Sequence, residues 1–156
     1  MKRHHVGAGI VLASLAALVL GGCATAPKMT AAETVAERQR VMKLNGASWA
    51  DAQAKLKAGS IEAIAVNAET MALLAREVPK LFPEGSMTEQ SKAKPEIWQK
   101  WPDFESAARN FQAQAEKLRD AAKSKNAAAT EAIAKEFGRQ ACGTCHTPFR
   151  VPPPRS

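Results

Sequence analysis

Residues 104–122 read FESAARNFQAQAEKLRDAA, and their apolar side chains recur at alternating intervals of three and four residues. This spacing places the apolar side chains along one side of an α-helix, as in helices that pack nearly parallel or antiparallel in a bundle. The positions on this side are Phe104, Ala108, Phe111, Ala115, Leu118 and Ala122. The stretch therefore predicts one bundle helix.

Three further segments carry a comparable periodicity. The first places Val35, Met42, Trp49 and Leu56 at intervals of seven, with Arg38, Asn45 and Ala52 between them. The second contains Ile61, Ile64, Ala68, Met71, Ala75 and Val78. The last begins near Asn126 and contains Ile133, Phe137, Ala141 and Cys145. Because no segment shows a convincing alternation with period two, the sequence predicts an all-α fold, an antiparallel four-helix bundle over residues 31–150.

The connections and the composition agree with such a bundle. Short breaks at Gly59-Ser60 and at residues 124–126 make the flanking helices antiparallel neighbours. The long segment 80–102 contains three prolines and connects the second helix to the third, whereas residues 151–156 form a proline-rich tail. With 156 residues, 5% aromatic residues and no Tyr, the chain is expected to form one domain, and the composition disfavours a β-sandwich.

The N-terminus has the order of an export signal. Lys2 and Arg3 precede an uncharged run, residues 6–20, that is shorter than the roughly 20 residues of a spanning helix. The following Leu20-Gly21-Gly22-Cys23 resembles a bacterial lipobox, in which the Cys is lipidated and becomes the first residue. We therefore expect a lipoprotein signal peptide at 1–22 and a tether at 23–30. Plain soluble secretion, with cleavage after Ala26, and an uncleaved anchor are the alternatives.

Cleavage before Cys23 would change the number of histidines and the net charge of the mature chain. His4 and His5 are removed with the signal, so His146 is the one histidine of the mature chain. Lys2 and Arg3 supply two of the seven net positive charges, which leaves +5 on residues 23–156. This excess is spread over helix faces and comes with no nucleic-acid-binding motif, so no nucleic-acid partner is expected.

The remaining cysteines lie in Cys142-Gly143-Thr144-Cys145-His146, which is the C-x-x-C-H attachment motif of a covalent c-type haem. The two thiols bond to the haem vinyl groups, and the adjacent His146 binds the iron. A thioredoxin-like pair would need the start of a βαβ unit, and a zinc site would need four ligands. A simple disulfide would leave His146 unexplained. One haem c per chain is the expected cofactor.

Four stretches carry a resemblance to a known family: residues 38–43 (RQRVMK), 81–86 (LFPEGS), 93–98 (AKPEIW) and 142–150 (CGTCHTPFR). They resemble the cytochrome c′ family, the class II c-type cytochromes, over nearly the whole mature chain. The resemblance implies a four-helix bundle that holds one haem, usually as a homodimer in the bacterial periplasm. Members carry electrons or bind small gases such as nitric oxide.

The resemblance also implies roles for individual residues. His146 is similar to the proximal iron ligand, with Arg150 as its electropositive neighbour, while Arg38 and Gln39 match the pair beside the haem propionates. Phe82 and Trp98 match positions around the haem. The residues themselves leave alternatives open, because Arg38 could be a solvated surface charge and the two aromatic residues ordinary core.

The sequence leaves two functions open, an electron carrier and a gas-binding protein, and Met42 distinguishes them. Met42 matches the position on the distal side of the haem, where it would either bind the iron through sulfur or cover it without bonding. An enzyme would need a distal acid–base group, and none is evident, so no enzymatic activity is expected. We expect redox proteins or small gases as partners, with an outer-membrane lipid anchor on the periplasmic side. A homodimer is expected through small residues on the first two helices: Ala50, Ala54, Ala65 and Ala72.

Overall fold

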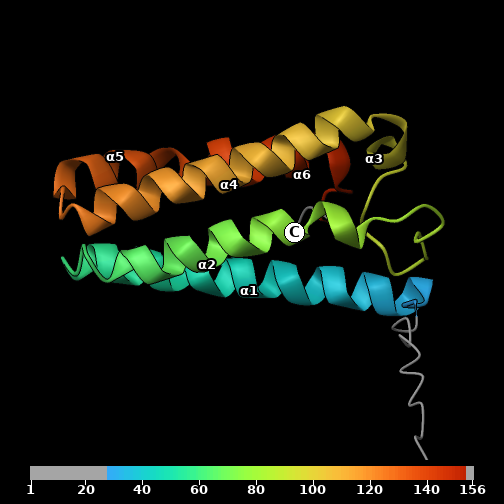
Figure 1. Ribbon diagram of the computed structural model, residues 1–156, viewed down its shortest axis with the longest axis horizontal. Coiled ribbons are helices and arrows are strands. Elements are labelled where there is room, and N and C mark those ends of the chain that lie inside the picture. The colour runs from blue at the N-terminus through green and yellow to red at the C-terminus, as the bar shows by residue number, and fades with distance from the viewer. Residues whose placement is uncertain (1–27, 154–156) are drawn as a thin grey trace, which may run out of the picture.

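The computed structural model describes residues 28–153, which form an elongated bundle of four long helical segments (Figure 1). Two pairs of antiparallel segments face one another, and this arrangement confirms the all-α, four-helix prediction. The four segments are α1 (Ala31–Lys57), α2 (Ile64–Glu77), α4 (Trp101–Lys123) and the run formed by α5 (Ala127–Phe137), η2 (Gly138–Cys142) and α6 (Gly143–Phe149). Over residues 28–153 no helix is long and apolar enough to cross a membrane.

Local sequence signals mark the ends of the helices. Thr30 caps α1 in a reciprocal pair with Glu33, and Asn126 caps α5 by accepting a hydrogen bond from the Ala129 amide at 3.0 Å. The turn between α1 and α2 contains Gly59 at φ 72°, a left-handed conformation that glycine adopts without strain. The predicted breaks at 59–60 and 124–126 are therefore confirmed.

The periodic positions form most of the core. Of the positions predicted for α2 and α4, most are buried, and Ala68, Ala115, Leu118 and Ala122 have no exposed surface. Trp49 belongs to this core, because its ring stacks on Phe137 with the centroids 4.6 Å apart. Alanine at so many core positions lets the helix backbones approach closely but buries little area per residue.

The predicted dimer face is wrong in one respect. Ala65 and Ala72 of α2 are 8% and 4% exposed and lie in the bundle core, whereas Ala50 and Ala54 of α1 are exposed. The reason is that α2 packs against both α1 and α4, so its buried side is wider than one stripe of residues. Small residues on α2 serve close packing within the chain.

The long connection from α2 to α4 covers one end of the bundle. It contains two short helices that the sequence did not predict, η1 (Pro79–Leu81) and α3 (Glu96–Gln99). Ile97 of this connection joins a second buried cluster with residues of α1, α4 and α6, and these partners include Val41, Phe104 and Phe149. This cluster forms the base of the functional site.

Candidate haem site

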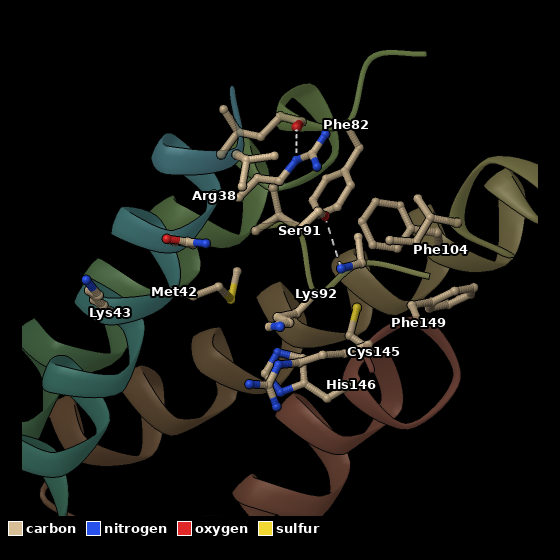
Figure 2. Close-up of a pocket in the computed structure, with 17 residues that line it drawn as sticks. Arg38, Met42, Lys43, Phe82, Ser91, Lys92, Phe104, Cys145, His146 and Phe149 are labelled. Carbon is tan, nitrogen blue, oxygen red and sulfur yellow. Dashed lines mark hydrogen bonds between the residues drawn. The ribbon is translucent and has the colours of Figure 1, made fainter. Parts of the chain in front are cut away.

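A cavity of about 430 Å³ lies at the end of the bundle that the connection covers (Figure 2). Its walls come from α1, the connection, α4 and α6, and they are predominantly apolar. The apolar lining residues are Val35, Met42, Val78, Leu81, Phe82, Ala93, Ile97, Phe104 and Phe149. A cavity of this size and lining suits an organic cofactor.

The two cysteines lie where η2 meets α6, and both thiols are free and half-buried. Cys145 lines the cavity, whereas Cys142 packs at the edge of the larger core cluster. Burial raises the pKa of Cys142, and burial together with the neighbouring Cys142 raises the pKa of Cys145 to about 11. A thioredoxin-type pair needs a thiol with a lowered pKa, so the electrostatics of this pair argue against that alternative.

A π-helical segment, η2, ends at Cys142, the first residue of the haem motif, and is anchored to α4. The Asn110 side-chain amide of α4 donates to the Gln140 carbonyl at 2.6 Å and to Thr144 Oγ1 at 3.2 Å. Thr144 Oγ1 in turn donates to the Ala141 carbonyl at 3.1 Å. The wider turns of a π-segment interrupt the backbone hydrogen-bond pattern of an α-helix, and such segments occur often at functional sites. The apolar periodicity predicted neither the π-segment nor the role of Asn110.

His146 lies one residue beyond Cys145 and borders the cavity from α6 (Figure 2). Burial and the positive charge of Arg150 lower the pKa of His146, which favours the neutral imidazole at pH 7. A neutral imidazole has the lone pair that a metal ligand requires. Arg150 follows the end of α6 and also lines the cavity, in a backbone bridge with Ala93.

Arg38 is 6% exposed, so the alternative of a solvated surface charge is wrong. Its Nε donates to the Leu81 carbonyl at 2.5 Å and its Nη1 to the Ser86 carbonyl at 2.9 Å, while Nη2 donates to Ser86 Oγ. The guanidinium carbon lies 4.0 Å from the centre of the Phe82 ring. Burial lowers the pKa of Arg38 to about 10, and among residues 28–153 no carboxylate pairs with it. A buried cation of this kind favours an anionic group in the adjoining cavity.

The other predicted haem-pocket residues occupy different positions around the cavity. Gln39 and Phe82 line it, and the Gln39 side-chain amide donates to the Gln90 carbonyl at 3.4 Å. Trp98 lies behind Phe82, with its Nε1 donating to the Phe82 carbonyl at 3.0 Å, and supports the wall without lining the cavity. The Met42 side chain extends from α1 into the cavity, on a different side from His146 (Figure 2).

These residues fit a c-type haem. The cavity brings together an imidazole, a thiol of the attachment motif, apolar walls and a buried cation that suits a propionate. Cys142 and Cys145 would hold the haem covalently, and His146 would bind its iron. Cys23 lies outside the described residues, so its predicted lipidation stays a prediction.

Comparison with known proteins identifies the family. Residues 33–150 match the family model described as Cytochrome C′. A protein of Agrobacterium fabrum called cytochrome c-556 is 33% identical over 144 residues, which cover 90% of this chain and 96% of that protein.

Two solved structures share the fold. One is a nitric oxide complex of a variant cytochrome c prime from Alcaligenes xylosoxidans, with a TM-score of 0.71 and 22% identity over 81% of this chain and all of that one. The other is a cytochrome c′ with ligand-controlled dimer dissociation, with a TM-score of 0.73 and 23% identity over the same shares. The matched family model, the cavity and the C-x-x-C-H motif together place this chain in the cytochrome c′ family, whose members bind c-type haem covalently.

Proposed function

We propose that the protein is an electron carrier in which His146 and Met42 would bind the haem iron. The supporting observation is the position of Met42, a soft sulfur donor that extends into the cavity on a different side from His146. The haem supplies one-electron chemistry, and His/Met ligation is an established arrangement in electron-transfer cytochromes. No enzymatic role is proposed.

The protein side chains have three tasks in this function. His146 presents a neutral nitrogen, because burial and Arg150 lower its pKa. Met42 presents its thioether, which needs no deprotonation and so binds at any physiological pH. The apolar walls, among them the buried Ile97, Phe104 and Phe149, lower the polarity around the site. Low local polarity and a fixed ligand set are the means by which a protein tunes a haem potential.

The test is the volume-conserving change Met42→Leu, with Met71→Leu as its control. Met71 lies in the larger core cluster and is 1% exposed, so the control also replaces a buried Met by Leu. We expect ferric wild type and the Met71 variant to be low-spin, with the charge-transfer band of a sulfur–iron bond, and Met42→Leu to be high-spin. A spectrum that is high-spin both before and after the Met42 change would refute Met42 ligation.

Gas binding is the second candidate. Met42 is only partly buried, and a flexible thioether can yield its place to a small ligand. A family neighbour has been solved with nitric oxide bound. Titration of the ferrous protein with carbon monoxide and nitric oxide distinguishes the two functions: spectral changes at micromolar gas favour gas binding, whereas unchanged spectra favour the carrier.

We further propose export to the periplasm and attachment to the outer membrane through lipid on Cys23. The proposal rests on the lipobox-like Leu20-Gly21-Gly22-Cys23, and acylation at two positions suffices for stable anchoring. Cys23→Ala should release haem-loaded cytochrome into the soluble periplasmic fraction. Unchanged membrane fractionation of the variant would contradict lipidation.

We also propose a homodimer formed through α1 and α2. Three large apolar side chains are exposed on these neighbouring helices: Leu44, Val66 and Leu73, at 50%, 64% and 52%. Exposed apolar side chains on adjacent helices are a common feature of subunit interfaces. On α2, Val66 and Leu73 take the place of the predicted Ala65 and Ala72, whereas the predicted Ala50 and Ala54 are exposed on α1.

A further inference from the structure

The charge around the cavity is one-sided. Four cationic residues line it, and no acidic residue within 28–153 does so. Arg38 is buried, but Lys43, Lys92 and Arg150 are exposed. We call these three residues the cationic rim.

The backbone holds two members of the rim close together. The Val151 amide donates to the Lys92 carbonyl at 2.8 Å, and the Lys94 amide donates to the Phe149 carbonyl at 2.9 Å. These hydrogen bonds flank the bridge between Ala93 and Arg150, so Lys92 and Arg150 lie on adjacent extended segments. Lys43 belongs to α1, on another side of the cavity from this bridge (Figure 2).

This arrangement is electrostatically unfavourable without an anion. Like charges on paired extended segments repel one another, and each rim cation lacks an ion-pair partner among residues 28–153. Some cations elsewhere in this range have a carboxylate partner, for example Lys55 with Asp51 at 2.7 Å, and others, such as Lys57 and Lys117, have none but lie outside the cavity lining. The rim therefore presents a positive field to solvent on the side where the cavity opens.

The propionates of the haem satisfy only part of this charge. A haem carries two propionate carboxylates, whereas four cations line the cavity. The buried Arg38 would balance the charge of one propionate. A surplus of positive charge stays at the opening. Such a field attracts anionic macromolecules and accelerates their association at low salt.

We propose that the cationic rim docks an acidic electron-transfer protein against the open side of the haem cavity. This inference rests on the proposed electron-carrier function and names the partner class for that site. A protein with clustered surface carboxylates fits better than a lipid surface, because the rim surrounds the cavity opening where electrons would enter or leave. Docking there brings the partner's redox centre close to the haem, while other faces of the bundle keep the centres farther apart.

The test follows the reduction of the ferric, haem-loaded protein by the hydroquinone of an acidic flavodoxin in a stopped-flow instrument. The second-order rate constant is measured from about 10 mM to 500 mM salt, which spans strong and weak screening. We expect the rate constant of wild type to fall steeply with salt. Lys43→Gln combined with Lys92→Gln should lower the low-salt rate constant about tenfold and flatten its salt dependence.

Two further variants make the result specific. Lys43→Arg with Lys92→Arg keeps the charge and should retain the wild-type salt dependence. Lys57→Gln with Lys117→Gln removes the same charge from exposed positions outside the cavity lining and should leave the rate within about twofold of wild type. Equal rates and slopes in the rim variant and in this control would overturn the proposal.

Separate measurements distinguish the other failures. An electrochemical titration tests the carrier itself: if the haem does not cycle reversibly between ferric and ferrous forms, the proposed function fails, whatever the rim does. Sedimentation with phosphatidylglycerol vesicles, in a Cys23→Ser background, tests the lipid alternative. Vesicle binding that the rim variant loses, with unchanged flavodoxin kinetics, would overturn docking of a protein in favour of a membrane surface.

Discussion

Arg38 divides its donors between two backbone carbonyls and the Ser86 hydroxyl, and it stacks over Phe82. A single side chain of α1 thus holds residues 81–86 of the connection against the bundle. Burial of a guanidinium is costly unless its donors are satisfied, and here three of them are used within the chain. Arg38 therefore has a structural role in addition to its proposed interaction with a haem propionate.

Replacement of Arg38 should be strongly destabilising. Arg38→Gln removes the fork that reaches Leu81 and Ser86 and leaves buried acceptors unpaired, so we expect a loss of about 3 kcal/mol in the free energy of unfolding. Urea unfolding of the haem-loaded protein measures this loss in the free energy of unfolding. Arg40→Gln is the control, because Arg40 is exposed and its ion pair is with Glu37 of the same helix, and this change should cost less than about 0.5 kcal/mol. Equal losses in the two variants would show that Arg38 has no such role.

At the scale of elements, the π-segment decides how the haem motif sits on α4. The Asn110 side-chain amide donates to the Gln140 carbonyl in η2 and to the Thr144 hydroxyl in α6. Asn110→Leu should lower the free energy of unfolding by about 1–2 kcal/mol, since the partly buried Gln140 carbonyl loses its donor. Thermal unfolding followed at the haem absorption band checks this. Gln112→Leu is the control, because the Gln112 side chain bonds to Glu116 of its own helix, and a matching loss there would contradict the assignment.

The α1–α2 pair is joined by a polar network that makes stability depend on pH. Asp51 accepts from Lys55 at 2.7 Å and from the Asn67 amide at 2.8 Å, and these hydrogen bonds lower the pKa of Asp51 below its ordinary value. A lowered pKa in the folded state stabilises the protein above the unfolded-state pKa, and this contribution disappears as the pH falls through the folded-state value.

Asp51→Asn should therefore reduce the urea midpoint at pH 7 and reduce it less at pH 3, where part of the wild-type contribution is already lost. Urea unfolding at both pH values gives the comparison. Glu131→Gln is a control on an exposed residue of α5, and it should change neither midpoint. A difference between Asp51→Asn and wild type that grows toward low pH would contradict the sign of this effect.

For the molecule as a whole, the haem is expected to be part of the core. The cavity walls contain large apolar side chains, and the helices around them are rich in alanine, so much of the available apolar contact is directed at the cofactor. Cys142→Ser with Cys145→Ser should yield a protein without covalent haem, and its free energy of unfolding should fall by at least about 3 kcal/mol. Haem staining of denaturing gels and urea unfolding measure the two effects. Stability equal to that of the haem-loaded protein would show that the bundle needs no cofactor.

The homodimer is tested on the exposed apolar surface of α1 and α2. Val66→Glu with Leu73→Lys should shift wild-type dimers to monomers in sedimentation at micromolar concentration, because charges at an apolar interface must be desolvated. The haem spectrum should stay unchanged, since neither residue lines the cavity. Met87→Glu on the connection removes another exposed apolar residue and should leave the dimer intact. A monomeric wild type would refute the dimer.

The sequence by itself determined the four long helical segments and the cofactor, and it predicted His146 as the iron ligand. Helical spacing of apolar residues is a local signal, and burial of Ile64, Leu118 and Phe137 follows from it because each helix has one inward side. The C-x-x-C-H motif is likewise local, since the chemistry of attachment needs those residues at that spacing. Gln39 and Phe82 line the cavity as the family resemblance implied.

Only the tertiary structure decided what depends on contacts between distant segments. It showed that Arg38 holds the connection, that Trp98 supports the wall from behind Phe82, and that Asn110 anchors the π-segment. It also moved Ala65 and Ala72 into the core and brought Lys92 beside Arg150. Periodicity says which side of a helix is buried but not how many neighbours that helix has, and charges far apart in the chain form one surface only after folding.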